Sequence, residues 1–267
     1  MPFLSRPQLG LITALLLAGV AAQAAPVPAG LSITGQVSFD LPNSTTPTGG
    51  AAQTGQLSLL SGGGSTSSSF NGSPAGGPLS GAFTATGDGI GAALSGSGSM
   101  SSPTAPDMTA GFVFVDYRID LINTSATQTF TILFQAAYGQ GNLAQASGDD
   151  AFAASSLSVY DAVYTELIYT DFFTDTLNPG NNKALASVAD TFSITLAPGQ
   201  SGYFTALQTM RGGVFEPGNF NAGLDAFLSL QRIDASGDDP GRLPLPASLP
   251  LALTALGLLG LVRKVRS

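Results

Sequence analysis

Apolar side chains alternate with small or polar ones through much of the chain, and this period of two constrains the fold more than any other feature. Residues 31–39 (LSITGQVSF) show it most clearly, and residues 112–122 (FVFVDYRIDLI) and 127–134 (TQTFTILF) repeat it. Successive side chains of a β-strand point to opposite faces, so the pattern predicts strands with one buried face. Outside the two ends of the chain, no window has the apolar spacing of an amphipathic helix. The pattern therefore predicts an all-β protein.

Turn-forming residues separate the predicted strands. Residues 123–126 (Asn-Thr-Ser-Ala) and 197–200 (Ala-Pro-Gly-Gln) are of the types that reverse a chain. Further β-branched and aromatic segments occupy residues 157–173, 191–196, 201–207 and 224–233. Short strands joined by tight turns bury their apolar faces when two sheets stack. We expect one domain, an antiparallel β-sandwich, over residues 25–239.

Residues 41–110 are rich in glycine and serine and are harder to interpret. Such segments bury too little apolar area to offset the entropy of ordering them. We therefore expect residues 41–78 to be mostly loop and residues 79–100 to add two strands weakened by glycine. The alternative is a set of thin strands at residues 56–60, 82–86 and 90–94.

The composition excludes several kinds of chemistry. The chain has no His, no Cys and no Trp. It therefore has no Ser-His-Asp triad, no cysteine nucleophile, no disulfide and no ordinary zinc or copper site. With no disulfide to stabilise it, the fold must depend on a hydrophobic core.

The N-terminal segment, residues 1–24, has the three parts of a secretory signal peptide. Arg6 supplies the positive charge, and residues 9–19 (LGLITALLLAG) form an apolar stretch. Ala22 and Ala24 then give the small-x-small pattern that signal peptidase recognises. The alternative is an uncleaved N-terminal anchor.

The C-terminal segment, residues 240–267, predicts a membrane hook. A linker leads through Leu243, Pro244, Leu245, Pro246 and Ala247 into the apolar residues 249–262. A helix over residues 247–262 would be about 24 Å long, slightly less than the hydrocarbon core of a bilayer. By the positive-inside rule, the basic residues that follow the helix stay on the cytoplasmic side. The sandwich would then lie on the opposite side of that membrane. The basic residues are Arg263, Lys264 and Arg266.

This arrangement of a proline motif, an apolar helix and a basic end resembles the PEP-CTERM sorting signal. Proteins that carry this signal are exported by Gram-negative bacteria and handled by an exosortase, a membrane protease and transpeptidase. The usual motif is Pro-Glu-Pro, whereas this chain has Pro244-Leu245-Pro246, which matches the Val-Pro-Leu-Pro-Ala variant with Leu243 in place of Val. The resemblance covers about 25 residues and implies an exosortase-like membrane transpeptidase and signal peptidase as partners. The alternative is a simple tail anchor.

The charge of the exported part disfavours nucleic acid and anionic lipid as partners. The whole chain has a formal net charge of −8. Removing Arg6 with the leader and Arg263, Lys264 and Arg266 with the basic end leaves five Lys and Arg against 17 Asp and Glu, a net charge of about −12.

Two sets of carboxylates are candidate sites. The sequence Ala-Ser-Gly-Asp-Asp occurs twice and places Asp149 with Asp150, and Asp238 with Asp239, on flexible loops. Paired carboxylates can bind Ca²⁺, although the spacing is not that of an EF-hand. Glu166 and Glu216 are the only two glutamates and could act together in a glycosidase, although solvated surface positions explain them better.

Taken together, these features predict an exported, non-enzymatic protein of the cell surface or extracellular matrix, associated with exopolysaccharide. The C-terminal helix would anchor the precursor in the inner membrane before processing. The alternative is a calcium- or glycan-binding module on the same hook. A hydrolase that uses the two glutamates is the third hypothesis.

Overall fold

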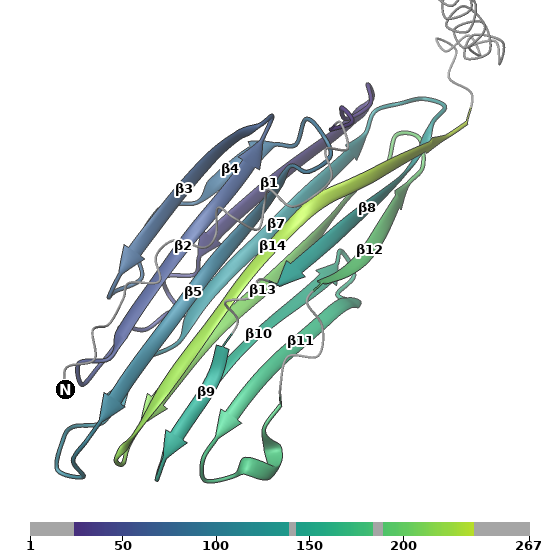
Figure 1. Ribbon diagram of the computed structural model, residues 1–267. Helices are drawn as coiled ribbons and strands as arrows, with labels where there is room; N and C mark the ends of the chain where they lie inside the picture. Colours follow the sequence, from purple (N-terminus) through teal and green to yellow (C-terminus); the bar gives the residue numbers. More distant parts are fainter. Residues whose placement is uncertain (1–23, 139–142, 184–188, 238–267) are drawn as a thin grey trace, which may run out of the picture.

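The computed structural model describes residues 24–138, 143–183 and 189–237. These residues form two antiparallel sheets that stack face to face (Figure 1). The predicted antiparallel β-sandwich is confirmed. The predicted signal peptide, sorting motif and C-terminal helix lie outside the described residues. Among the described residues, no helix has the length and apolar character needed to cross a bilayer.

Each sheet contains seven strands among the described residues. Sheet 1 has the order β11-β10-β13-β7-β1-β4, with β6 paired to β13, and sheet 2 has the order β12-β8-β14-β5-β2-β3, with β9 paired to β14. The strands of sheet 1 are β1 (Leu31–Phe39), β4 (Leu79–Ala82), β6 (Met108–Thr109), β7 (Val113–Asn123), β10 (Ala151–Asp161), β11 (Glu166–Asp175) and β13 (Ser201–Val214). The strands of sheet 2 are β2 (Ala52–Ser61), β3 (Gly64–Asn71), β5 (Gly89–Met100), β8 (Thr129–Tyr138), β9 (Leu143–Gly148), β12 (Ala189–Leu196) and β14 (Gly218–Ser236). A short 3-10 turn, η1 (Pro179–Asn181), follows β11.

The core lies between the sheets and is built from the alternating side chains that the sequence displays. In β1, residues Leu31, Ile33, Val37 and Phe39 point inward and are buried. Three phenylalanine rings join the sheets at one end of the core. The centroid of Phe204 in sheet 1 lies 4.8 Å from those of Phe134 and Phe192 in sheet 2.

Buried polar groups also link the two sheets. The Tyr117 hydroxyl donates to Gln208 Oε1, and Gln208 Nε2 donates to the Leu224 carbonyl at 2.6 Å. Tyr117 and Gln208 belong to sheet 1, and Leu224 belongs to sheet 2. Burial raises the pKa of Tyr117 well above its ordinary value. The hydroxyl therefore stays protonated and remains a donor.

The expected turn at residues 123–126 is confirmed and is fixed by one side chain. Asn123 is buried, and its Oδ1 accepts a hydrogen bond from the Ser125 N–H at 2.9 Å. Its Nδ2 lies 2.8–3.1 Å from the carbonyls of Gln128, Leu196 and Ala197. One amide therefore holds this turn against the turn at residues 197–200.

The expectation that residues 41–78 are mostly loop fails for residues 52–71, where the alternative strand at residues 56–60 is present within β2. This segment contains the β2–β3 hairpin, which extends sheet 2 at its edge. Leu57, Leu59 and Phe70 are buried and supply its inner face, while half of the positions of β3 are exposed serine or threonine. The two strands predicted within residues 79–100 are present as β4 and β5.

The β-rich stretch at residues 157–173 is divided between two strands. A turn over residues 162–165 separates β10 from β11, and Tyr164 in it adopts a φ of 62°. The Asp161 side chain accepts hydrogen bonds from the N–H groups of Val163 and Thr165 at 2.9 and 2.8 Å. An aspartate at the end of β10 therefore forms a turn without glycine or proline.

Candidate binding face

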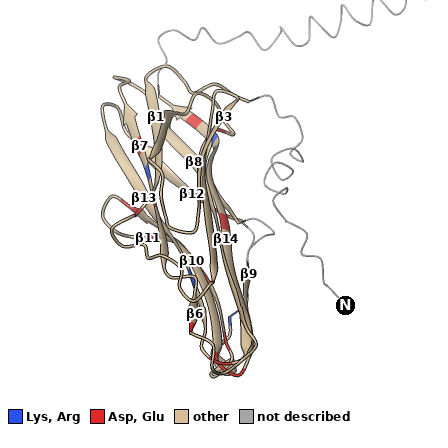
Figure 2. Cartoon of the chain, turned by 90° about the vertical axis from the view of Figure 1, so that its left-hand side faces the viewer, with Lys and Arg blue, Asp and Glu red and all other residues tan. Residues whose placement is uncertain are grey.

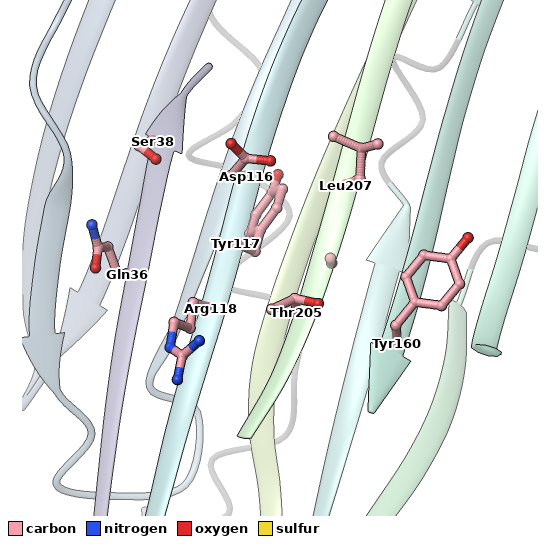
Figure 3. Close-up of a pocket in the computed structure, with 9 residues that line it drawn as sticks. Gln36, Ser38, Asp116, Tyr117, Arg118, Tyr160, Thr205 and Leu207 are labelled. Atoms are coloured by element: carbon pink, nitrogen blue, oxygen red, sulfur yellow. The ribbon is translucent and has the colours of Figure 1, made fainter. Parts of the chain in front are cut away.

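The outer face of sheet 1 holds a shallow hollow of about 400 Å³ that opens to solvent (Figure 3). Four adjacent strands form it, namely β1, β7, β13 and β10. Its lining residues are Gln36, Ser38, Asp116, Tyr117, Arg118, Tyr160, Thr205, Ala206 and Leu207. Because these strands are antiparallel and in register, residues remote in sequence form one row across the sheet. Gln36, Arg118, Thr205 and Tyr160 are successive partners in that row.

An arginine and a carboxylate give the hollow its charge. Arg118 donates from Nε and Nη2 to the carboxylate of Asp120, with Nη2 2.7 Å from Oδ1. Its guanidinium also lies 4.1 Å from the centroid of the Tyr203 ring. The hydrogen bond to Asp120 raises the pKa of Arg118. Partial burial, together with the nearby Asp40 carboxylate, raises the pKa of Asp116.

Aromatic side chains surround the hollow on the same face. Phe114 and Phe112 lie beside it at one end of β7, and Phe152 lies across β13 in β10. Arg211 of β13 contacts both Phe112 and Phe152. Near the edge of the sheet, Lys183 pairs with Asp171 and lies 5.6 Å from the ring centroid of Tyr169. This face, which we call the aromatic face, therefore combines flat rings with cations.

The predicted calcium residues are only partly described. Asp149 and Asp150 form the turn between β9 and β10, at the acidic end of the sandwich that Figure 2 shows near β6 and β9. Their backbone groups are bonded to the β13–β14 turn: Asp149 N–H donates to the Pro217 carbonyl, and the Asp150 carbonyl accepts from Phe215 N–H. Asp238 and Asp239 lie outside the described residues. Over the described ranges, no three His, Cys, Asp or Glu side chains gather closely enough to hold a metal ion.

The hypothesis of a catalytic glutamate pair is wrong. Glu166 pairs with Tyr160 at one end of β10, whereas Glu216 lies in the turn beyond the opposite end of β13. Tyr160 is level with Thr205, so the two glutamates are about 30 Å apart at the rise of a β-strand. Glycosidase carboxylates lie within about 10 Å of each other. Both glutamates are exposed, as the surface interpretation expects.

A bulge sets the orientation of Glu166. Glu166 and Ile168 are two residues apart and would share a face in a regular strand. The register shifts between Val159 and Tyr160, so Ile168 points into the core while Glu166 is exposed.

Asp88 holds two loops together, a role that no local sequence pattern indicates. This carboxylate is 3% exposed and accepts hydrogen bonds from the backbone N–H groups of Gly62, Thr84 and Ala85 at 2.6–3.1 Å. It thereby ties the β2–β3 turn to the segment between β4 and β5. The available signal was its isolation, because Asp88 and Asp107 are the only charged residues in positions 41–110.

Comparisons with known proteins do not identify a family. No family model matches the chain, and no curated protein matches it. The VP2 subviral particle of infectious bursal disease virus aligns over 87% of this chain and 72% of its own, with 10% identity and a TM-score of 0.17. The structure of the Gx strain of that virus aligns over 85% and 71%, with 10% identity and a TM-score of 0.14. At these scores the likeness carries no argument about fold or function.

Proposed function

We propose that this chain is an exported, non-enzymatic protein of the cell surface or extracellular matrix, processed through a PEP-CTERM-type signal. The observation that carries the proposal is the order of segments in the sequence. An apolar leader with Ala22 and Ala24 precedes the sandwich, and a Pro244-Leu245-Pro246 motif, an apolar segment and a basic end follow it. This order would export the sandwich and hold the precursor in the inner membrane by its C-terminal segment.

The sandwich has features that would keep it stable outside the cell without disulfides. Its 14 described strands enclose a continuous apolar core, and polar side chains such as Asn123 and Asp88 fasten its loops. A large buried core can stabilise a chain that has no cysteine.

The sorting motif is tested by changing Pro244 and Pro246 together to Ala. We expect the variant to be exported normally, because its leader is intact, and to accumulate as unprocessed precursor in the membrane fraction. Changing Pro240 to Ala is the matched control, since this proline lies in the same linker but outside the motif. Release of the double variant at the rate of the unchanged protein would contradict the proposal.

Binding of a glycan by the sandwich is a second candidate function, and the aromatic face favours it. Flat rings offer contact area, and the hollow beside them offers the guanidinium, hydroxyl and amide groups of Arg118, Thr205 and Gln36 as hydrogen-bond partners. A hollow that is open and shallow suits a polymer lying across the sheet. The partner in this second candidate function is exopolysaccharide.

A further inference from the structure

Arg211 occupies an unusual position on the aromatic face. Its guanidinium carbon lies 5.0 Å from the ring centroid of Phe112 and 5.6 Å from that of Phe152. The two rings come from opposite sides of β13, because Phe112 precedes β7 and Phe152 lies in β10. Arg211 is exposed, so its position between two rings leaves the guanidinium edge open to solvent.

The two flanking rings are themselves supported. Phe112 stacks on Phe114 with centroids 5.6 Å apart and an interplanar angle of 8°. Phe152 stacks on Phe215 with centroids 6.1 Å apart and an angle of 14°. The order Phe114, Phe112, Arg211, Phe152, Phe215 forms a row that we call the ring ladder. Contacts on both sides reduce the freedom of the arginine, so it loses little further entropy when it binds a ligand.

The charge environment points to an anionic partner for Arg211. Among the described residues, the other three cations each pair with a carboxylate: Arg118 with Asp120, Lys183 with Asp171 and Arg232 with Asp234. No described carboxylate pairs with Arg211, although the described ranges contain 15 Asp and Glu. A guanidinium presents a planar fork of N–H donors that matches the two oxygens of a carboxylate. Arg211 is therefore an oriented donor without a described acceptor.

We propose that the ring ladder binds an acidic polysaccharide, with a uronic acid carboxylate on Arg211 and the apolar edges of neighbouring sugars against Phe112 and Phe152. This inference rests on the glycan-binding function proposed above and names its ligand class. The hollow lies on the same face, and Thr205 is about 20 Å from Arg211 along β13. An extended polymer can reach both places, whereas a single sugar cannot.

The negative charge of the protein does not prevent this binding at physiological salt. Charges separated by more than about 8 Å are largely screened at 0.15 M ionic strength. Asp116 is level with Leu207, four residues from Arg211 along β13, and Asp150 is four residues from Ala154, the β10 partner of Arg211. Both carboxylates are therefore about 13 Å away along the strands and act weakly on a carboxylate bound at Arg211. Because the guanidinium is exposed, each contact is weak, and a polymer gains affinity by engaging several units at once.

The test measures retention of the purified full-length chain, in detergent, on polygalacturonate and on neutral hydroxyethyl cellulose by affinity electrophoresis. We expect retention on polygalacturonate alone, and we expect Arg211→Gln to lower the apparent affinity at least fivefold. Arg211→Lys keeps the positive charge but loses the planar pair of N–H donors. Its affinity should therefore lie between that of the unchanged protein and that of Arg211→Gln. Arg232→Gln, which removes an exposed cation from sheet 2, is the matched control and should bind normally.

Three outcomes would overturn the inference: no retention of the unchanged protein, equal retention on the neutral polymer, or equal losses in Arg211→Gln and Arg232→Gln. Thermal melts of each variant separate a loss of binding from a loss of folding. The result is independent of sorting, because the assay uses purified precursor. A failure here would therefore leave the experiment on Pro244 and Pro246 unaffected.

Discussion

The two outer faces of the sandwich differ sharply in side chains although their backbones are alike. The face of sheet 1 carries phenylalanine and tyrosine rings with Arg118, Lys183 and Arg211 against them. At its β2–β3 edge, the face of sheet 2 carries short polar side chains, such as the adjacent Ser67 and Ser58 in β3 and β2. Antiparallel sheets present one face to solvent, and its side chains determine what can bind there. The comparison indicates that sheet 1 has the better surface for a ligand.

An aromatic side chain on sheet 2 shows that rings on the two faces have different roles. Phe227 of β14 covers Gly89 and Gly91 of β5, and a Cβ atom added to either glycine would meet its ring within 2.6–2.9 Å. Phe227 therefore fills the space left by two glycines. On sheet 1, Phe112 is 39% exposed and contacts a cation instead. We infer that Phe227 serves stability and that Phe112 serves binding.

We expect the largest loss of stability from a change at Asp88, which joins the β2–β3 hairpin of sheet 2 to the segment between β4 and β5. Asp88→Asn keeps one accepting oxygen and replaces the other with an NH2 group that can only donate. The side chain is buried, so the backbone N–H groups that it accepts from lose part of their acceptor. We expect a loss of about 3 kcal/mol in the free energy of unfolding, measured by urea denaturation. Asp107→Asn changes an exposed charge in the same glycine-rich region and should cost little. Equal losses in both variants would contradict this role for Asp88.

A smaller loss of stability is expected from Phe227→Ala. Removing the ring exposes the two glycines beneath it and deletes apolar contacts at a partly buried site. We expect about 2 kcal/mol of destabilisation in urea, with retention on polygalacturonate unchanged. A variant that kept its stability and lost retention would reverse the roles assigned to the two faces.

Phe112→Ala should have the opposite profile. Its ring is partly exposed and its contact with Arg211 is a surface cation–π interaction, so we expect a loss below about 1 kcal/mol in the urea experiment. Retention on polygalacturonate should fall severalfold, because Arg211 loses one of its two flanking rings. If retention is unchanged, the ring ladder does not contribute to binding.

The smallest effect is expected from Asp116→Asn in the hollow. Burial and the Asp40 carboxylate raise the pKa of Asp116 above its ordinary value of 3.8. Between 3.8 and the raised value the folded chain therefore holds more protons at this group, so stability falls as the pH rises through that window. Asp116→Asn should give a slightly higher Tm than the unchanged protein at pH 7 and the same Tm at pH 3. A lower Tm at pH 7 would show that the carboxylate is stabilising.

Sequence reasoning succeeded where apolar residues alternate strongly. Residues 31–39 were predicted as a strand, and β1 has the same bounds. The β2–β3 hairpin was missed because β3 has few apolar residues: Phe70 alone is a buried hydrophobic residue there. The hairpin forms because β2 pairs with β5 and so extends sheet 2. This pairing depends on a strand about 35 residues further along the chain, and the residues of the hairpin do not reveal it.

The aromatic face could not be predicted from the sequence for a different reason. Phe112, Phe152 and Arg211 are about 40 and 60 positions apart along the chain, and only the strand order β10-β13-β7 brings them together. Periodicity predicts which residues share a face of one strand, but it does not predict which strands are neighbours. Asp88 was missed for the same reason, since its donors come from two separate segments.

The central claim, that the sandwich is delivered as a processed surface protein, is tested most directly by the intact mass and C-terminal peptide of the protein recovered from its native cells. The account predicts a chain that begins near Ala25 and ends near Ala247, with any attached sugars as added mass. A chain that still carries residues 263–267 would be a permanent membrane-anchored protein and would contradict the claim.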